Sequence, residues 1–243
     1  MICATPTRRK RALVAVTLFV FSLCTLVKNS LNKAMRKTSQ NARSSSCLYG
    51  DNVDLRLIIM TYNRPSSLQK LLDSLQMLEV DGRSAAMEIW IDRNQHTGAA
   101  STQTIKVASD FKWNRGPSRV HIHTTHVGIY GQWIDTWCPH NKSDNEIAIF
   151  LEDDVTVSKY AYRWTHAVFH AYSHRTDFAG ASLAGYQFKA LSKKRKRNLA
   201  GPKNHTAMMY KCFSTWGFAP EPFHWRHFQV REAFLEAQDV YTL

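Results

Sequence analysis

A buried strand that ends in three acids is the feature that most constrains this sequence. Residues 147–151 are apolar without a break and run directly into Glu152, Asp153 and Asp154. A continuous apolar run of this length is typical of a strand covered on both faces, as in the centre of a parallel sheet. In open α/β sheets ligands bind outside the carboxyl ends of the strands, so these acids are expected at a binding edge.

Two interpretations of the acidic triplet follow from this stretch alone. Three adjacent negative charges repel one another unless a cation neutralises them, and Mg²⁺ or Mn²⁺ prefers carboxylate oxygens, which predicts a metal site. The alternative is a polar loop after a strand, with solvated acids.

Strands and helices are expected to alternate along the chain after residue 51. The apolar runs predict strands at 55–60, 87–91, 119–123, 147–151 and 178–185. Helical spacing or helix length predicts helices at 65–75, 97–110, 128–137, 159–174 and 222–238. Strands separated by helix-length segments predict an α/β fold with a doubly wound, mainly parallel sheet flanked by helices.

The net charge of +13 is concentrated in two short segments. Five basic residues lie within residues 1–28 and five more form the run 193–197, so removing these ten charges leaves +3 for the remainder. This is too little for a basic nucleic-acid-binding face. A nuclear or nucleic-acid-binding protein is therefore supported only by the 193–197 run.

The amino-terminal region predicts a membrane anchor. Residues 12–27 are apolar, with basic residues on both sides. A cleaved signal peptide is the alternative, but no small-x-small cleavage site follows the run. We expect a cytosolic tail at 1–11, a transmembrane signal anchor at 12–27, a stem at 28–50 and a folded domain at 51–243. The protein would then be a single-pass type II protein of the Golgi or ER membrane.

The sequons at Asn141 and Asn204 agree with a lumenal, N-glycosylated body. Cys47, Cys138 and Cys212 belong to that body, and their odd number allows one disulfide and a free thiol without fixing the pairing.

Polar residues follow three of the predicted strands on the same edge of the sheet. Residues 61–64 leave the first strand, Asp92 leaves the second, and residues 152–154 leave the fourth. An acid could bind the sugar or base of a nucleotide, and a metal could bind its phosphates. A nucleotide-sugar transferase needs this combination, because the departing diphosphate develops negative charge that a cation stabilises.

These segments resemble GT-A fold glycosyltransferases of the family 2-like kind. The resemblance is carried by LIIMTYNRPSSLQKLLDSL (57–75), IWID (89–92), HVGIYGQW (126–133), IFLEDD (149–154) and STWGFAPE (214–221). The Glu-Asp-Asp form is similar to that of the N-acetylglucosaminyltransferase of the N-glycan pathway. The resemblance implies a metal-dependent, inverting transfer of a sugar from a UDP-sugar donor to a glycan or protein acceptor.

The resemblance also implies roles for individual residues. Asp154 would bind Mn²⁺ or Mg²⁺, Glu152 and Asp153 would lie towards the ribose and the metal's water shell, and Asp92 would lie against the uridine or ribose. The base pocket would be lined by Thr61, Tyr62 and Arg64.

The catalytic base is not identified by this resemblance. Glu221 is a weak candidate, because such a base comes from the acceptor half of these enzymes and few acids follow Glu221. The alternative is a catalytically inactive transferase-like protein that binds a sugar nucleotide or a glycan.

Overall fold

The computed structural model describes residues 49–139, 145–183 and 215–229. Its six-stranded sheet has the order β3-β2-β1-β4-β6-β5. The strands are β1 (Leu55–Thr61), β2 (Ala85–Ile91), β3 (Ser118–Ile122), β4 (Ile147–Glu152), β5 (Gly180–Ser182) and β6 (Phe218–Pro220). β1 runs parallel to β2 and β4, β2 runs parallel to β3, and β6 is antiparallel to both β4 and β5. The predicted mainly parallel α/β sheet is confirmed.

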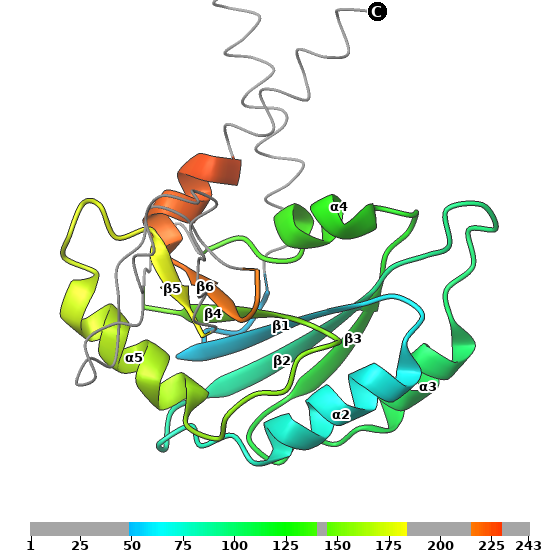
Figure 1. The fold of residues 1–243 in the computed structure, drawn as a ribbon, viewed down its shortest axis with the longest axis horizontal. Coiled ribbons are helices and arrows are strands. Elements are labelled where there is room, and N and C mark those ends of the chain that lie inside the picture. The colour runs from blue at the N-terminus through cyan, green and yellow to red at the C-terminus, as the bar shows by residue number, and fades with distance from the viewer. Residues whose placement is uncertain (1–48, 140–144, 184–214, 230–243) are drawn as a thin grey trace, which may run out of the picture. The chain divides into compact units, whose positions relative to one another are not determined.

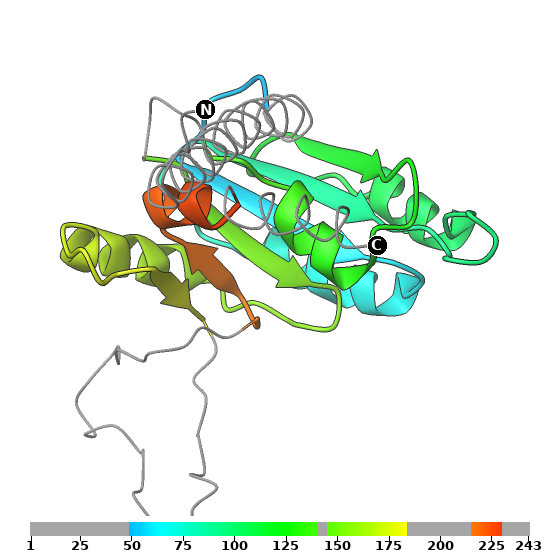
Figure 2. The same ribbon diagram turned by 90° about the horizontal axis from the view of Figure 1, so that it is seen from above.

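Helices cover both faces of this sheet (Figures 1 and 2). The described helices are α2 (Pro65–Gln76), α3 (Thr102–Asp110), α4 (Gly128–Asp135), α5 (Ala161–Tyr172) and a further helical segment that starts at Pro222. α2, α3 and α5 pack on one face, whereas α4 and the segment from Pro222 lie on the other. A parallel sheet that is covered on both faces has apolar strands, which explains the uninterrupted run in β4.

The core has one large and one small apolar cluster, one on each face of the sheet. The alternating residues Leu55, Leu57 and Ile59 of β1 face the large cluster with α2, α3 and α5. Ile58 and Met60 face the small cluster, which is rich in tryptophan and phenylalanine. The period-2 alternation of a strand therefore sends β1 into both clusters, and every residue of β1 is buried.

Some element boundaries differ from the predicted ones for local reasons. α3 begins at Thr102 instead of residue 97, because the hydroxyl of Ser101 accepts a hydrogen bond from the Thr104 amide and caps the helix. β6 lies within an apolar stretch for which no strand was predicted. Within the strand predicted at 178–185, β5 covers Gly180–Ser182, and residues 184 and 185 lie outside the described part of the chain.

Residues 1–48 lie outside the described part of the chain, so the tail, the anchor and most of the stem stay predictions. No described helix is long and apolar enough to cross a membrane. Tyr49, which was expected in the stem, instead packs within the unit formed by residues 47–228. Its ring lies under the guanidinium of Arg56 at 4.3 Å, and its hydroxyl donates to the Thr136 carbonyl.

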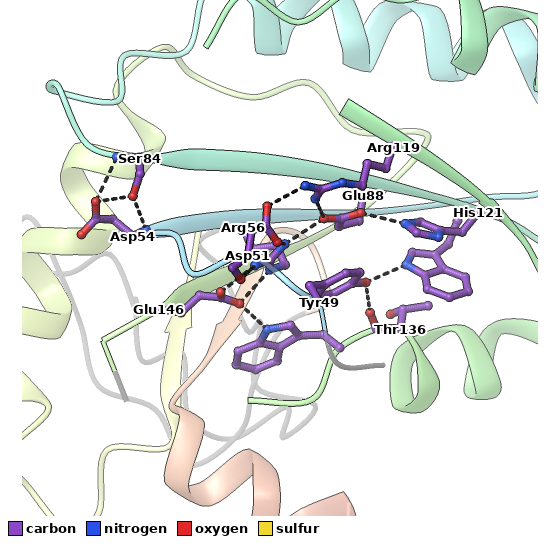
Figure 3. Close-up of polar contacts among 12 residues, drawn as sticks. Tyr49, Asp51, Asp54, Arg56, Ser84, Glu88, Arg119, His121, Thr136 and Glu146 are labelled. Atoms are coloured by element: carbon purple, nitrogen blue, oxygen red, sulfur yellow. Dashed lines mark hydrogen bonds and ion pairs between the residues drawn. The ribbon is translucent and has the colours of Figure 1, made fainter. Parts of the chain in front are cut away.

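A buried ion cluster joins the amino-terminal ends of the central strands (Figure 3). Arg56 of β1 is 1% exposed and donates to Glu88 of β2 at 2.8 Å and to both oxygens of Glu146, just before β4, at 2.9 Å. Asp51 accepts a further bond from Arg56 at 3.2 Å. Arg119 and His121 of β3 complete the cluster through contacts of 2.7 Å with Glu88.

The cluster keeps the Arg56 charge inside the protein. Burial alone would lower the pKa of Arg56, but the hydrogen bond and charge of Glu146, with the charges of Asp51 and Glu88, outweigh burial and raise the pKa above its usual range. The guanidinium is therefore always charged, and its removal would take the charged partner from Glu146 and leave the buried Glu88 with Arg119 and His121.

We predict that Arg56→Ala lowers the free energy of unfolding by about 3–5 kcal/mol, because Glu146 loses its charged partner and the buried Glu88 loses one of its three. Urea denaturation of the purified protein measures this. Arg163→Ala is the matched control, since Arg163 makes exposed ion pairs with Glu79 and Asp81 and its loss should change stability little. Equal effects of the two changes would contradict the prediction.

Candidate functional site

The candidate site lies at the carboxyl ends of β1 and β4. These strands are neighbours at the point where the strand order reverses, because β2 and β3 continue on one side of β1 while β4 lies on the other. Such a switch point is where open α/β sheets bind ligands. The residues that follow β1 and β4 meet here, as the sequence predicted.

Asp153 is the internal member of the acidic triplet. Its Oδ2 accepts a hydrogen bond from the Thr61 hydroxyl at 2.7 Å, and its Oδ1 lies 3.2 Å from Nη1 of Arg64. The Asp153 side chain is only 6% exposed, and Thr61 is 2% exposed. Both residues therefore join β1 to β4 from inside the domain and present little surface to a ligand.

Asp154 and Arg64 are the accessible charged pair of the site. Nη1 of Arg64 lies 3.3 Å from Oδ2 of Asp154, and the two side chains are 60% and 51% exposed. The guanidinium bridges Asp153 and Asp154, so it supplies one positive charge between two carboxylates. A dissolved cation or an anionic ligand can reach both exposed groups.

Glu152 lies beneath α4. Its half-buried position raises the pKa of its carboxyl, and the charges of Asp154 and Asp153 raise it further. Arg64 and a hydrogen bond from Trp133 of α4 lower the pKa and offset part of this rise. Burial is the largest cause of the raised pKa, and repulsion from the two neighbouring acids adds to it.

Asp92 follows β2 at the same edge and is 3% exposed. Its Oδ1 accepts from the amides of Arg93 at 2.8 Å and Val127 at 3.0 Å. Its Oδ2 accepts from the Gly128 amide at 2.9 Å and lies 3.0 Å from Nδ1 of His126. Asp92 is thus tied to the segment that leads into α4.

Three exposed aromatic side chains belong to segments at the acid-bearing edge or to α4. Tyr62, after β1, is 37% exposed and accepts a hydrogen bond from Asn94 at 2.8 Å. Tyr130 in the first turn of α4 is 49% exposed, and Trp216 is 53% exposed. Trp216 precedes β6, whose antiparallel pairing of Phe218 with Phe150 places it towards the acid-bearing edge. Aromatic faces of this kind suit stacking on bases and sugars.

Glu221 does not lie with the acidic triplet. β6 runs antiparallel to β4, so the chain moves away from the acids before it reaches Glu221. One oxygen of Glu221 accepts from the His224 amide at 2.9 Å, which caps the helical segment that starts at Pro222. The predicted glycosylation sites Asn141 and Asn204 lie outside the described residues.

Two residues of α4, Gln132 and Trp133, contact the ends of β1 and β4 although neither was predicted as a site residue. Nε2 of Gln132 donates to the Thr61 carbonyl at 3.1 Å, and Trp133 donates to Glu152 and stacks on Phe150 with ring centroids 5.0 Å apart. Both residues lie in the segment 126–133 that carried part of the family resemblance. That segment was a usable signal, although it did not indicate which atoms the two side chains contact.

We predict that Glu152→Gln increases the free energy of unfolding at pH 7. The folded state raises the pKa of this carboxyl, so ionisation costs stability: the cost is absent below the usual glutamate pKa of about 4.3 and complete above the raised value. Gln keeps the shape and an acceptor for Trp133. Urea denaturation at pH 7 and below pH 4 measures the gain. Asp110→Asn is the control, because the Asp110 side chain at the end of α3 is exposed. A gain that does not grow with pH would contradict this prediction.

Comparisons with known proteins assign no family to this chain. No family model and no curated protein matches it. Among solved structures, it is similar to a crystal structure of S. aureus TarS 1–349, with a TM-score of 0.39 and 16% sequence identity. The match covers 49% of this chain and 33% of that chain, so this chain matches about a third of the TarS structure. A similarity this distant carries no weight for function, which has to be inferred from the site.

Proposed function

We propose that the protein is a metal-dependent glycosyltransferase that moves a sugar from a UDP-sugar donor to a glycan or protein acceptor. The observation that supports this most directly is the pairing of Arg64 with Asp153 and Asp154 at the β1–β4 switch point. A nucleotide-sugar has a diphosphate that needs positive charge and a base and sugar that suit aromatic surfaces. The charged and aromatic groups around Asp154 offer both.

The acids fit Mn²⁺ or Mg²⁺ by their chemistry. No group of three or more His, Cys, Asp or Glu side chains suited to a metal occurs among the described residues. Mg²⁺ does not need such a cage, because it is commonly held by one or two carboxylates together with substrate phosphates. Asp154 is exposed enough to be that carboxylate, and a cation there would reduce the repulsion among the three adjacent acids.

In this proposal each residue has a distinct task. The metal, when bound, neutralises the charge that develops on the departing diphosphate. Asp154 holds it, and Arg64, freed from the carboxylates, can donate to the phosphate oxygens. Tyr62 offers its exposed ring to the base. Thr61 and Asp153 keep the ends of β1 and β4 together, so that these groups stay at a fixed spacing.

The proposed location is the lumen of the Golgi or ER, with a type II membrane anchor at residues 12–27. Cys138 is disulfide-bonded, and disulfides persist in oxidising compartments such as the secretory pathway. The basic residues before the apolar run favour a cytosolic amino terminus.

We predict that the protein made in animal cells loses mass on endoglycosidase treatment, and that Asn141→Gln and Asn204→Gln remove this sensitivity. Gel mobility before and after treatment measures it. An untreated chain that already migrates as the unmodified polypeptide, found in the nucleus, would instead support the rival based on residues 193–197.

A catalytically inactive donor-binding protein is the second candidate. The position of Glu221 supports it, since this weak candidate for the base follows β6 on the side away from Asp154 and its carboxylate caps the next helical segment. Release of free sugar from UDP-sugars, or transfer to a glycan acceptor, separates an enzyme from a binder.

We predict that Asp154→Ala weakens Mn²⁺-dependent UDP binding at least about 100-fold, equivalent to about 2.7 kcal/mol. The variant should also lose the difference between binding with and without Mn²⁺. Calorimetric titration of the purified protein measures both effects. Asp177→Ala is the matched control, because that exposed carboxylate pairs only with Arg175 among the described contacts and lies after α5. Unchanged UDP binding by Asp154→Ala would contradict the proposed site.

A further inference from the structure

We propose that Asp92 is a positioning residue that holds α4 over the donor site, and that it does not contact the nucleotide. The inference rests on the proposed function for what the site binds. It replaces the role that family resemblance implied for Asp92, a direct contact with uridine or ribose. The basis is the set of contacts around its carboxylate.

The carboxylate of Asp92 has little exposed surface to offer a ligand. Three backbone amides, those of Arg93, Val127 and Gly128, lie 2.8 to 3.0 Å from its two oxygens, and His126 adds a fourth contact at 3.0 Å. The three amide hydrogen bonds occupy most of the roughly four acceptor positions of the two oxygens, and Nδ1 of His126, which also lies 2.7 Å from the Arg93 carbonyl, stands against Oδ2. With Asp92 3% exposed, a nucleotide would have to displace an existing donor.

α4 needs this support from outside. It is eight residues long, and a helix this short is not stable on its own. Val127 at its N-cap position supplies no side-chain hydrogen bond, so the first amides of α4 have no local cap. Asp92, which follows β2, accepts hydrogen bonds from two amides at this end of α4. Its carboxylate also places a negative charge near the positive end of the helix.

The position of α4 matters because the helix contacts both strands at the switch point. Gln132 donates to the Thr61 carbonyl at the end of β1, and Trp133 donates to Glu152 at the end of β4. Movement of the helix start would disturb both contacts and the exposed Tyr130 in the same turn. Asp92 therefore acts on the site through three residues of one helix.

Gly128 offers a way to test this without changing a charge. Its φ of 65° lies in the region that L residues rarely adopt, and a Cβ there would meet nothing closer than His126 Nε2 at 3.7 Å. Gly128→Ala should thus strain the first residue of α4 by its backbone alone. Asp92→Asn disturbs the same junction from the other side, because its amide group would face N–H donors.

The experiment is a double-mutant cycle on the full chain with Asp92→Asn, Gly128→Ala and the double variant. Amide hydrogen exchange of residues 126–133 without nucleotide is expected to become at least tenfold faster in each single variant. UDP binding with Mn²⁺, measured by calorimetry, is expected to weaken about tenfold in each. The double variant should bind no more than about twofold worse than the weaker single variant, because both changes break one junction.

Matched controls carry the same chemical changes elsewhere. Asp110→Asn removes the charge of an exposed side chain at the end of α3. Gly82→Ala, before β2, changes a glycine with a φ of 74° at which an added Cβ would meet no other atom within 4 Å. Neither should alter exchange of residues 126–133 or UDP affinity. Gly128→Ala keeps the test informative if Asp92→Asn fails to fold.

Two results would overturn the inference. One is unchanged exchange of residues 126–133 in Asp92→Asn. The other is a loss of UDP affinity in the double variant that equals the product of the two single-variant losses. That result is expected if Asp92 contacts the nucleotide independently of Gly128. If the wild-type protein binds no UDP, the proposed function fails, whereas the exchange measurement still decides whether Asp92 anchors α4.

Discussion

The guanidinium of Arg56 is buried near the amino-terminal end of the central strand β1. It has almost no access to water, so its charge must be balanced by protein groups. Leaving a buried charge uncompensated costs several kcal/mol, about as much as the net stability of many domains. Its partners come from β2, from the segment before β1 and from the segment before β4. A slip of β1 by one residue would turn Arg56 into the large apolar cluster on the other face, so this ion cluster also fixes the register of the central strands.

The two ends of the same strands treat charge in opposite ways. At the amino-terminal end, Arg56 and Arg119 are matched with three carboxylates in a compact, mostly buried set. At the carboxyl end, three adjacent acids meet Arg64, which is largely exposed. The amino-terminal set is therefore the more closely compensated of the two, and the accessible charges of these strands lie at the carboxyl end.

The strands and the convergence of acids at one edge were predictable from the sequence. Apolar runs marked β1, β2 and β4, and the direction rule for parallel strands then placed Asp92 and residues 152–154 on one side. The partners of these side chains were not predictable, because they depend on contacts between distant segments. The sequence around Asp92 does not indicate that the amides of Val127 and Gly128 bind its carboxylate. Likewise, the sequences of β1 and β2 do not indicate that Arg56 and Glu88 form an ion pair between these mostly apolar strands. The direction of the short strand β6, which decides where Glu221 lies, is likewise set by pairing and not by composition.

A backbone hydrogen bond beside the paired strands β5 and β6 joins the two described ends of the connection between them. The Leu183 amide donates to the Gly217 carbonyl at 2.9 Å, at the edge where β5 ends and β6 is about to begin. The chain therefore leaves the sheet and returns to it beside the acid-bearing edge, with both departure points pinned by backbone hydrogen bonds. Sequence changes between these two points would therefore leave the pairing of β5 with β6, and with it the strand register, unchanged.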